Sequence, residues 1–357
     1  MCFNTRLCAV TCLLLLLGGC ASTPQTRQLE TQIPSSLPAA FELKQTPFNP
    51  QSKYQCGPAA LATVLQFHEY KISPEQLVDE VYIPQRKGSL QIEISASARR
   101  HQMLPYVLNP ELEDLLAEIA AGHPVLVFQN LGFAWYPQWH YAVAIGYDLQ
   151  QQHIILRSGT EKRHITPFKL FERTWQRADH WALVILPVGQ IPQTANADSY
   201  LQIAHAFEQT AQSDLAYKAY KAASIKWPDN HQAWMLLGNM AYQQNDYPGA
   251  VNAFSKVTQL DTYHADGWNN LAYALLADSC SQQAVKALQC GLKIAPDNKN
   301  LQHSWQEISQ QSDRPERKDC PSVGCEKLEA KENALKCRST LNGRMHGPKG
   351  GAQGCAE

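Results

Sequence analysis

Between residues 41 and 190 the hydrophobic positions change their spacing partway along the chain. The first half has the three-to-four-residue spacing of amphipathic helices, which predicts helices at residues 56–68, 90–103 and 111–121. The second half has short β-branched and aromatic runs bounded by turn residues, which predict strands at residues 124–129, 140–147, 153–156 and 181–186. Helices followed by strands predict an α+β domain with an antiparallel sheet.

A second pattern, with a period of 34 residues, fills residues 197–311. Large aromatic residues recur at this interval at Tyr200, Trp234 and Trp268, and small residues recur at Ala204, Gly238 and Ala272. This period and these residue types resemble tetratricopeptide repeats, in which small residues allow paired helices to approach closely. The resemblance implies an all-α solenoid of three repeats and a terminal helix.

The N-terminus has the three parts of a secretory signal over residues 1–19. Arg6 precedes an apolar run at residues 13–17, and small residues lead to a cysteine. The ending Leu17-Gly18-Gly19-Cys20 resembles the lipobox of bacterial lipoproteins, which implies acylation of Cys20 and anchoring by several acyl chains. Ala21 rather than Asp at the next position favours the outer membrane, facing the periplasm. An ordinary cleaved signal with a chance cysteine is the alternative.

Composition refines this picture of the remaining chain. The formal charge is −1, so nothing indicates a nucleic-acid partner, and no other apolar run is long enough to cross a bilayer. Residues 20–40 are rich in Ser, Thr, Pro and Gln and predict a flexible tether. Residues 312–357 are charged and poor in aliphatic clusters, so we expect a disordered tail.

Eleven cysteines suggest a disulfide protein, but their distribution argues otherwise. Cys280 and Cys290 are ten residues apart along one predicted helix, about 15 Å, which is too far for a bond between them. We therefore expect both to be thiols. The four tail cysteines match no zinc spacing. Cys56 has no partner in its own domain, which predicts a thiol kept free in an oxidising compartment.

Two segments carry the candidate chemistry, Gln51-Ser52-Lys53-Tyr54-Gln55-Cys56-Gly57-Pro58 and Trp139-His140-Tyr141. A nucleophilic cysteine needs a thiolate, which a helix N-terminus and a nearby histidine favour. Cys56 is at the start of a predicted helix, and His140 begins a predicted strand. Gln51, in the loop before the helix, lies within reach of the space in front of the sulfur as a donor to an oxyanion.

These segments resemble the papain-like peptidases that process bacteriocin precursors after a double-glycine leader, and their free-standing relatives. The resemblance covers about residues 48–188 and rests on QCGPAALATVL and HYAVAIGYD. It implies that Cys56 is the nucleophile, His140 the general base and acid, and Gln51 the oxyanion-hole side chain. No metal or other cofactor is needed for this mechanism.

One position departs from that family, which orients its histidine with an Asp at the end of the next strand. Here the sequence reads Leu156-Arg157-Ser158-Gly159, and Asp148 is about 26 Å along the strand from His140. Ser158 can accept the imidazole N–H, but it stabilises the imidazolium less than a carboxylate does. A working Cys–His dyad and a degenerate site both remain open.

Three functions follow from these patterns. The first is a membrane-anchored thiol peptidase whose repeats bind its protein or peptide substrate, or an envelope protein partner. The second is a catalytically degenerate domain that serves as a binding or assembly scaffold. The third uses the same dyad on other amide substrates, such as cell-wall peptides. The first accounts for the largest number of these residues.

Overall fold

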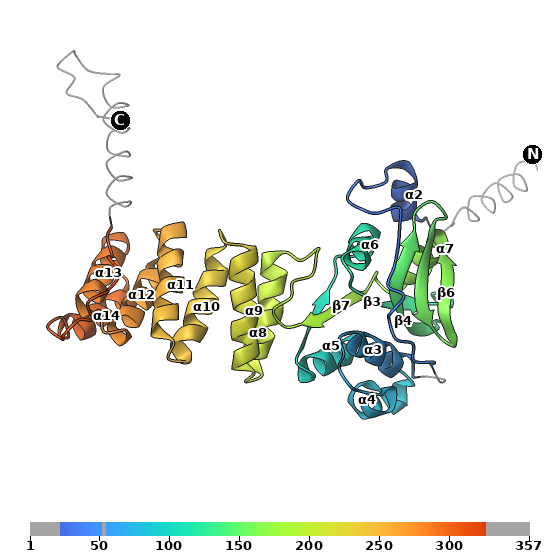
Figure 1. Ribbon diagram of the computed structural model, residues 1–357, viewed down its shortest axis with the longest axis horizontal. Helices are drawn as coiled ribbons and strands as arrows, with labels where there is room; N and C mark the ends of the chain where they lie inside the picture. The colour runs from blue at the N-terminus through green and yellow to red at the C-terminus, as the bar shows by residue number, and fades with distance from the viewer. Residues whose placement is uncertain (1–21, 52–54, 326–357) are drawn as a thin grey trace, which may run out of the picture. The chain divides into compact units, whose positions relative to one another are not determined.

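The computed structural model describes residues 22–51 and 55–325, and the chain divides into two compact units after Phe207 (Figure 1). The signal residues 1–19 and the lipid site Cys20 lie outside the described residues, as do Cys337 and Cys355 of the tail. Within the described part of the chain, no helix combines the length and the apolar composition needed to cross a membrane.

The first unit is built on a seven-stranded sheet in which every named pair of strands is antiparallel. In spatial order the strands are β2 (Met103–Val107), β7 (Ala182–Pro187), β3 (Val125–Asn130), β4 (Trp139–Asp148), β5 (His153–Ser158) and β6 (Glu161–Pro167). The short strand β1 (Ala40–Glu42) pairs with the far end of β4. The antiparallel α+β fold predicted from the sequence is therefore confirmed.

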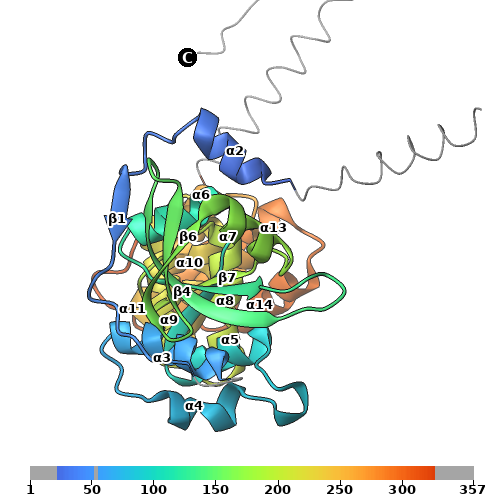
Figure 2. The ribbon, with the colours of Figure 1, turned by 90° about the vertical axis from the view of Figure 1, so that its right-hand side faces the viewer.

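Helices cover both faces of this sheet (Figures 1 and 2). One face carries α3 (Cys56–Phe67), α4 (Pro74–Val81) and α5 (Gln91–Arg100), with the short 3-10 helix η1 (Pro84–Arg86) between the last two. The other face carries α2 (Pro24–Thr31), α6 (Leu112–Ala120) and α7 (Phe168–Gln176). Since α3 is apolar on nearly every side, residues 57–65 are all buried, and they form the core with β3 and β4.

The segment that we expected to be a flexible tether is partly folded, so this prediction is wrong for residues 24–31. These residues form α2, whose Thr26 and Leu29 are buried. The buried carboxylate of Glu172 on α7 accepts hydrogen bonds from the backbone N–H of Gln25 at 3.0 Å and of Thr26 at 2.7 Å. A carboxylate at a helix N-terminus satisfies exposed N–H groups and interacts favourably with the helix dipole. Composition alone did not reveal this tertiary partner.

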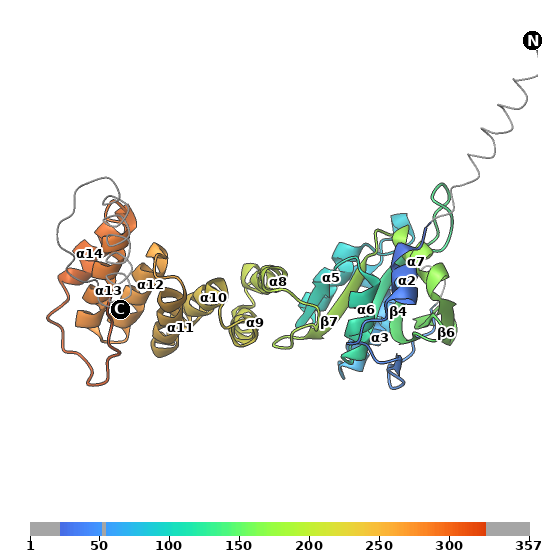
Figure 3. The same ribbon diagram turned by 90° about the horizontal axis from the view of Figure 1, so that it is seen from above.

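The remaining helices follow the repeat pattern. They are α8 (Ala197–Gln209), α9 (Ser213–Lys226), α10 (His231–Gln243), α11 (Tyr247–Leu260), α12 (Ala265–Ala277), α13 (Ser281–Ile294) and the terminal α14 (Lys299–Ser309). In the second unit, α9 to α14 stack in chain order (Figure 3). A Cβ on Gly238 would lie 2.6 Å from the ring of Phe254, which explains the small residue at this repeat position.

The C-terminal segment corrects two predictions. Cys280 forms a disulfide with Cys320, and Cys290 forms one with Cys325, with Cα–Cα distances of 5.6 and 5.5 Å. The prediction that Cys280 and Cys290 are thiols is therefore wrong, and so is the prediction of disorder for residues 312–325. Arg317 also pairs with Asp278 at 2.8 Å. Two covalent bonds hold this segment against α13, and Val323 packs against the core of the repeats, although the segment has no periodic apolar pattern.

Candidate active site

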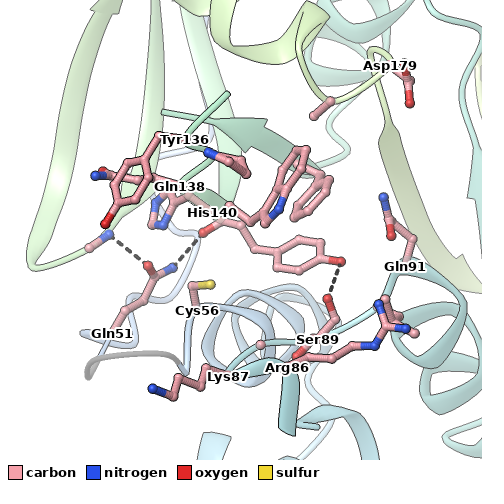
Figure 4. Close-up of a pocket in the computed structure, with 18 residues that line it drawn as sticks. Gln51, Cys56, Arg86, Lys87, Ser89, Gln91, Tyr136, Gln138, His140 and Asp179 are labelled. Atoms are coloured by element: carbon pink, nitrogen blue, oxygen red, sulfur yellow. Dashed lines mark hydrogen bonds between the residues drawn. The ribbon is translucent and has the colours of Figure 1, made fainter. Parts of the chain in front are cut away.

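Cys56 is the first residue of α3, and among the described residues it is the free cysteine. Its side chain is partly buried and faces a cleft beside the sheet (Figure 4). The next residue must be small, because a Cβ on Gly57 would lie 2.2 Å from Ser89 Oγ. The close approach of Ser89 to the helix start therefore forms one wall of the cleft beside the thiol.

His140 is the second residue of β4 and reaches the same cleft from the sheet. Its Nε2 lies 2.8 Å from the hydroxyl oxygen of Ser158, the last residue of the neighbouring strand β5. The antiparallel pairing of β4 with β5 thus places the hydroxyl where the sequence comparison expected an orienting acid. Since Nε2 is engaged with Ser158, Nδ1 is the ring nitrogen left to take a proton from the thiol.

Gln51 is held in front of the helix start by three hydrogen bonds. Its backbone N–H donates to Gly159 O at 2.9 Å, and its Oε1 accepts from Gly159 N at 3.1 Å. Its Nε2 donates to the carbonyl oxygen of Tyr141 at 3.0 Å. The side-chain amide has two hydrogens, so the second can point into the cleft. Gln51, Cys56 and His140 accordingly lie together at one end of the cleft (Figure 4).

Burial controls the charge state of the two candidate catalytic groups. It raises the pKa of the Cys56 thiol above its usual value of 9.0, while hydrogen bonds from the backbone of Tyr141, Gly57 and Cys56 itself oppose this rise. Burial also lowers the pKa of His140 to about 4, with a smaller contribution from His164. Both shifts favour the uncharged form. At neutral pH the resting site therefore holds a neutral thiol beside a neutral imidazole.

The cleft has a volume of about 1030 Å³. Tyr136 lies on one side, and the segment from Arg86 to Gln91 lines the other (Figure 4). Trp139 also lines the cleft. Asp179 lies at the far end, away from His140, and does not replace the missing acid. No cluster of candidate metal ligands occurs among the residues that the structure describes. The arrangement is suited to hold an extended chain against a nucleophile.

The structure brings together all four residues singled out in the sequence, and it adds supporting residues that sequence reasoning missed. Arg157 is almost fully buried, and its guanidinium donates to Thr46 O at 2.8 Å, which fixes the chain that leads to Gln51. Gly159 holds Gln51 through the two hydrogen bonds described above, and its φ of 57° is in the left-handed region that favours glycine. Asp148 caps the turn after β4 by accepting from Gln151 N at 2.8 Å, at the end of the strand opposite to His140.

Comparison with known proteins shows that two parts of the chain match known families. Residues 42–183 match the Peptidase C39-like family, and residues 201–265 match the tetratricopeptide repeat family. The chain therefore has an α+β domain that matches the C39-like peptidases, followed by helices that match tetratricopeptide repeats, in agreement with the two resemblances found in the sequence.

Individual relatives cover only parts of the chain. A TPR repeat-containing protein of Schizosaccharomyces pombe is 32% identical over 84 residues, which are 23% of this chain and 10% of that protein. The chain thus spans about a tenth of the length of this curated relative.

Solved structures similar to the first unit include two peptidases. One is a double glycine motif protease from an AMS/PCAT transporter in complex with the leader peptide, with 20% identity and a TM-score of 0.34 over 41% of this chain and 94% of the other. Another is a C39-like peptidase from Bacillus anthracis, with 17% identity and a TM-score of 0.36 over 43% of this chain and 99% of the other.

Proposed function

We propose that the protein is a thiol peptidase of the bacterial envelope that cleaves peptide bonds in a protein or peptide substrate. The observation that carries this proposal is the meeting of two chain segments in one cleft of a C39-like domain. Cys56 reaches the cleft from the start of a helix, and His140 reaches it from the start of a strand with its ring fixed by Ser158. This is the constellation that nucleophilic thiol catalysis needs.

In this mechanism, Nδ1 of His140 takes the thiol proton while Cys56 Sγ bonds to the substrate carbonyl carbon. The oxyanion accepts hydrogen bonds from the backbone N–H of Cys56 and from the second hydrogen of Gln51 Nε2. The C–N bond then breaks, and the imidazolium gives its proton to the leaving amine. Water, deprotonated by His140, attacks the thioester, which returns the thiol and releases the acid product.

The lipid on Cys20 and the placement in the envelope belong to the same proposal. They are supported by the lipobox pattern, and the two disulfides of the last repeat agree with an oxidising compartment. Mass spectrometry of the mature N-terminal peptide tests the lipid. We expect an acylated Cys20 peptide from the membrane fraction of the parent and no acylated peptide from the Cys20→Ser variant, whereas an unmodified Cys20 contradicts this part of the proposal.

The repeats have the role of binding the substrate or a partner protein in this proposal. Stacked repeats present an extended surface that commonly holds peptide segments. A second function, a catalytically degenerate scaffold, is favoured by the hydroxyl of Ser158 where the resembling peptidases carry an acid. In that case the repeats are the working part of the molecule and Cys56 is dispensable.

Cleavage of a peptide library by the purified mature chain separates these functions. We expect new N-termini with the parent protein and none with Cys56→Ala or His140→Ala, provided both variants keep the parent thermal midpoint. Equal peptide patterns for the parent and Cys56→Ala, together with unchanged partner capture, refute the peptidase and favour the scaffold. Amine release from purified cell wall without cleavage of the library indicates another amide substrate.

A further inference from the structure

The turn that joins β3 to β4 presents a cluster of aromatic side chains to solvent. Trp135 is 82% exposed, and Phe133 and Tyr136 are each 63% exposed. The rings of Phe133 and Trp135 stack on one another, with centroids 5.6 Å apart and an interplanar angle of 5°. Phe133 and Trp135 do not line the cleft, although Tyr136 does. Exposed apolar clusters of this kind mark interaction surfaces.

The backbone of this turn is held in one conformation by its own hydrogen bonds. Asn130 Oδ1 accepts from Gly132 N at 3.0 Å and from Gln138 N at 2.9 Å. The backbone N–H groups of Phe133 and Tyr136 each donate to the other's carbonyl, at 3.1 and 3.2 Å. Because these polar groups are paired within the turn, its tip can enter a medium less polar than water without leaving them unsatisfied.

Helix α7 connects this turn to the N-terminal helix α2. At one end of α7, Lys169 pairs with Glu30 of α2 at 2.7 Å. Just beyond its other end, Arg177 donates to the carbonyl oxygen of Gly132 in the turn. Lys169, Arg173 and Arg177 follow one another at intervals of four residues, so they form a basic row along one side of the helix. This row extends from α2 to the base of the aromatic turn.

The start of α2 lies close to the proposed lipid site. Glu172 fixes the first turn of the helix through the backbone of Gln25 and Thr26, as described above. Thr23, the N-cap of α2, follows Cys20 by three positions in the chain, which gives a reach of at most about 10 Å. In Figures 2 and 3 the β3–β4 turn and the start of α2 project toward the same side of the domain.

We propose that Phe133 and Trp135 insert into the lipid–water interface of the membrane that holds Cys20, with the basic row facing anionic headgroups. Aromatic rings concentrate at such interfaces, and basic side chains near the surface are attracted to anionic lipids. This inference rests on the lipid attachment in the proposed function, but it does not depend on catalysis. Because Tyr136 also lines the cleft, insertion places the cleft at the membrane surface. Its substrates are then peptide segments next to a membrane.

Vesicle binding by the full mature chain tests this inference, with Cys20→Ser so that no acyl chain contributes. We expect the parent to sediment with vesicles of phosphatidylethanolamine and phosphatidylglycerol. The double variant Phe133→Ser/Trp135→Ser loses about tenfold or more in affinity, since burial of two rings is lost. Ile92→Ser, which removes a 68% exposed side chain elsewhere in the domain, is the matched control and binds as the parent does.

Two further measurements keep the result independent of folding and of activity. Brominated lipids quench the tryptophan fluorescence of the parent, and Trp135→Phe removes most of this quenching while the thermal midpoint is unchanged. Cys56→Ala binds vesicles like the parent, so an inactive enzyme does not count against the inference. Equal vesicle binding by the double variant and the parent overturns it. An equal loss of vesicle binding in Ile92→Ser also overturns it. The same holds if the double variant raises KM for soluble peptides and leaves vesicle binding unchanged.

Discussion

Replacement of Ser158 tests how the imidazole is held and how far the site depends on a neutral partner. The 2.8 Å contact between Ser158 Oγ and His140 Nε2 is a hydrogen bond between uncharged groups. Such a bond contributes about 1 kcal/mol, so Ser158→Ala should lower kcat/KM about fivefold. Ser158→Asp places a carboxylate beside the ring and favours the imidazolium, because an opposite charge opposes the effect of burial on the pKa of His140.

The size of the effect of Ser158→Asp follows from the stronger hydrogen bond that a carboxylate makes to the imidazolium. A hydrogen bond to a charged group is worth about 1.5–3 kcal/mol, which corresponds to roughly 10- to 150-fold more thiolate–imidazolium pair. The rate of Cys56 alkylation by iodoacetamide at pH 6, followed by peptide mass spectrometry, measures this without a known substrate. The other cysteines between residues 55 and 325 are in disulfides, and Ser158→Thr keeps the hydroxyl as a control. No acceleration in Ser158→Asp refutes this view of the site.

Three other predictions concern charge and stability. The pKa of His140 is lowered to about 4 and that of Cys56 is raised above 9.0, so kcat/KM should stay level from about pH 5 to 8.5. A loss of activity already at pH 6.5 contradicts a neutral dyad. Glu172→Gln should weaken the docking of α2 by about 1–3 kcal/mol, seen as faster hydrogen exchange in α2 but not in α3. A Cys280→Ser/Cys320→Ser variant removes a disulfide between residues 40 positions apart. It should lower the free energy of unfolding of the repeats, measured in urea, by about 4 kcal/mol, and an unchanged urea midpoint is the contrary result.

Strongly periodic elements could be predicted from the sequence, whereas edge strands could not. The repeats and α3 are visible because each has a clear apolar pattern. Strand β2 was missed because Pro105 interrupts its pattern, and it is tolerated there because β2 lies at the edge of the sheet. Strand β6 was missed because the consecutive charged residues Glu161, Lys162 and Arg163 put charges on both of its faces, which removes the alternation of apolar and polar positions.

The chemistry of the site was predictable to a similar extent. The positions of Cys56 at the start of a helix and of His140 at the start of a strand could be predicted, because each depends only on the residues next to it in the chain. The clamp on Gln51 is not, because it depends on Gly159, which comes 108 residues later. The disulfide partners were hidden for the same reason, since spacing along the chain reveals which cysteines cannot pair but not which ones meet.

The two disulfides of the last repeat also fix the direction in which the chain returns along α13. Cys280 and Cys290 are about 15 Å apart on the helix, and the five steps along the chain from Cys320 to Cys325 span at most about 18 Å when extended. The returning segment therefore has little slack and runs parallel to the helix. Exchange of the two partners would require it to run the opposite way. Of the two ways to pair Cys280 and Cys290 with Cys320 and Cys325, the structure has the one that goes with this direction, and in it Arg317 lies beside Asp278.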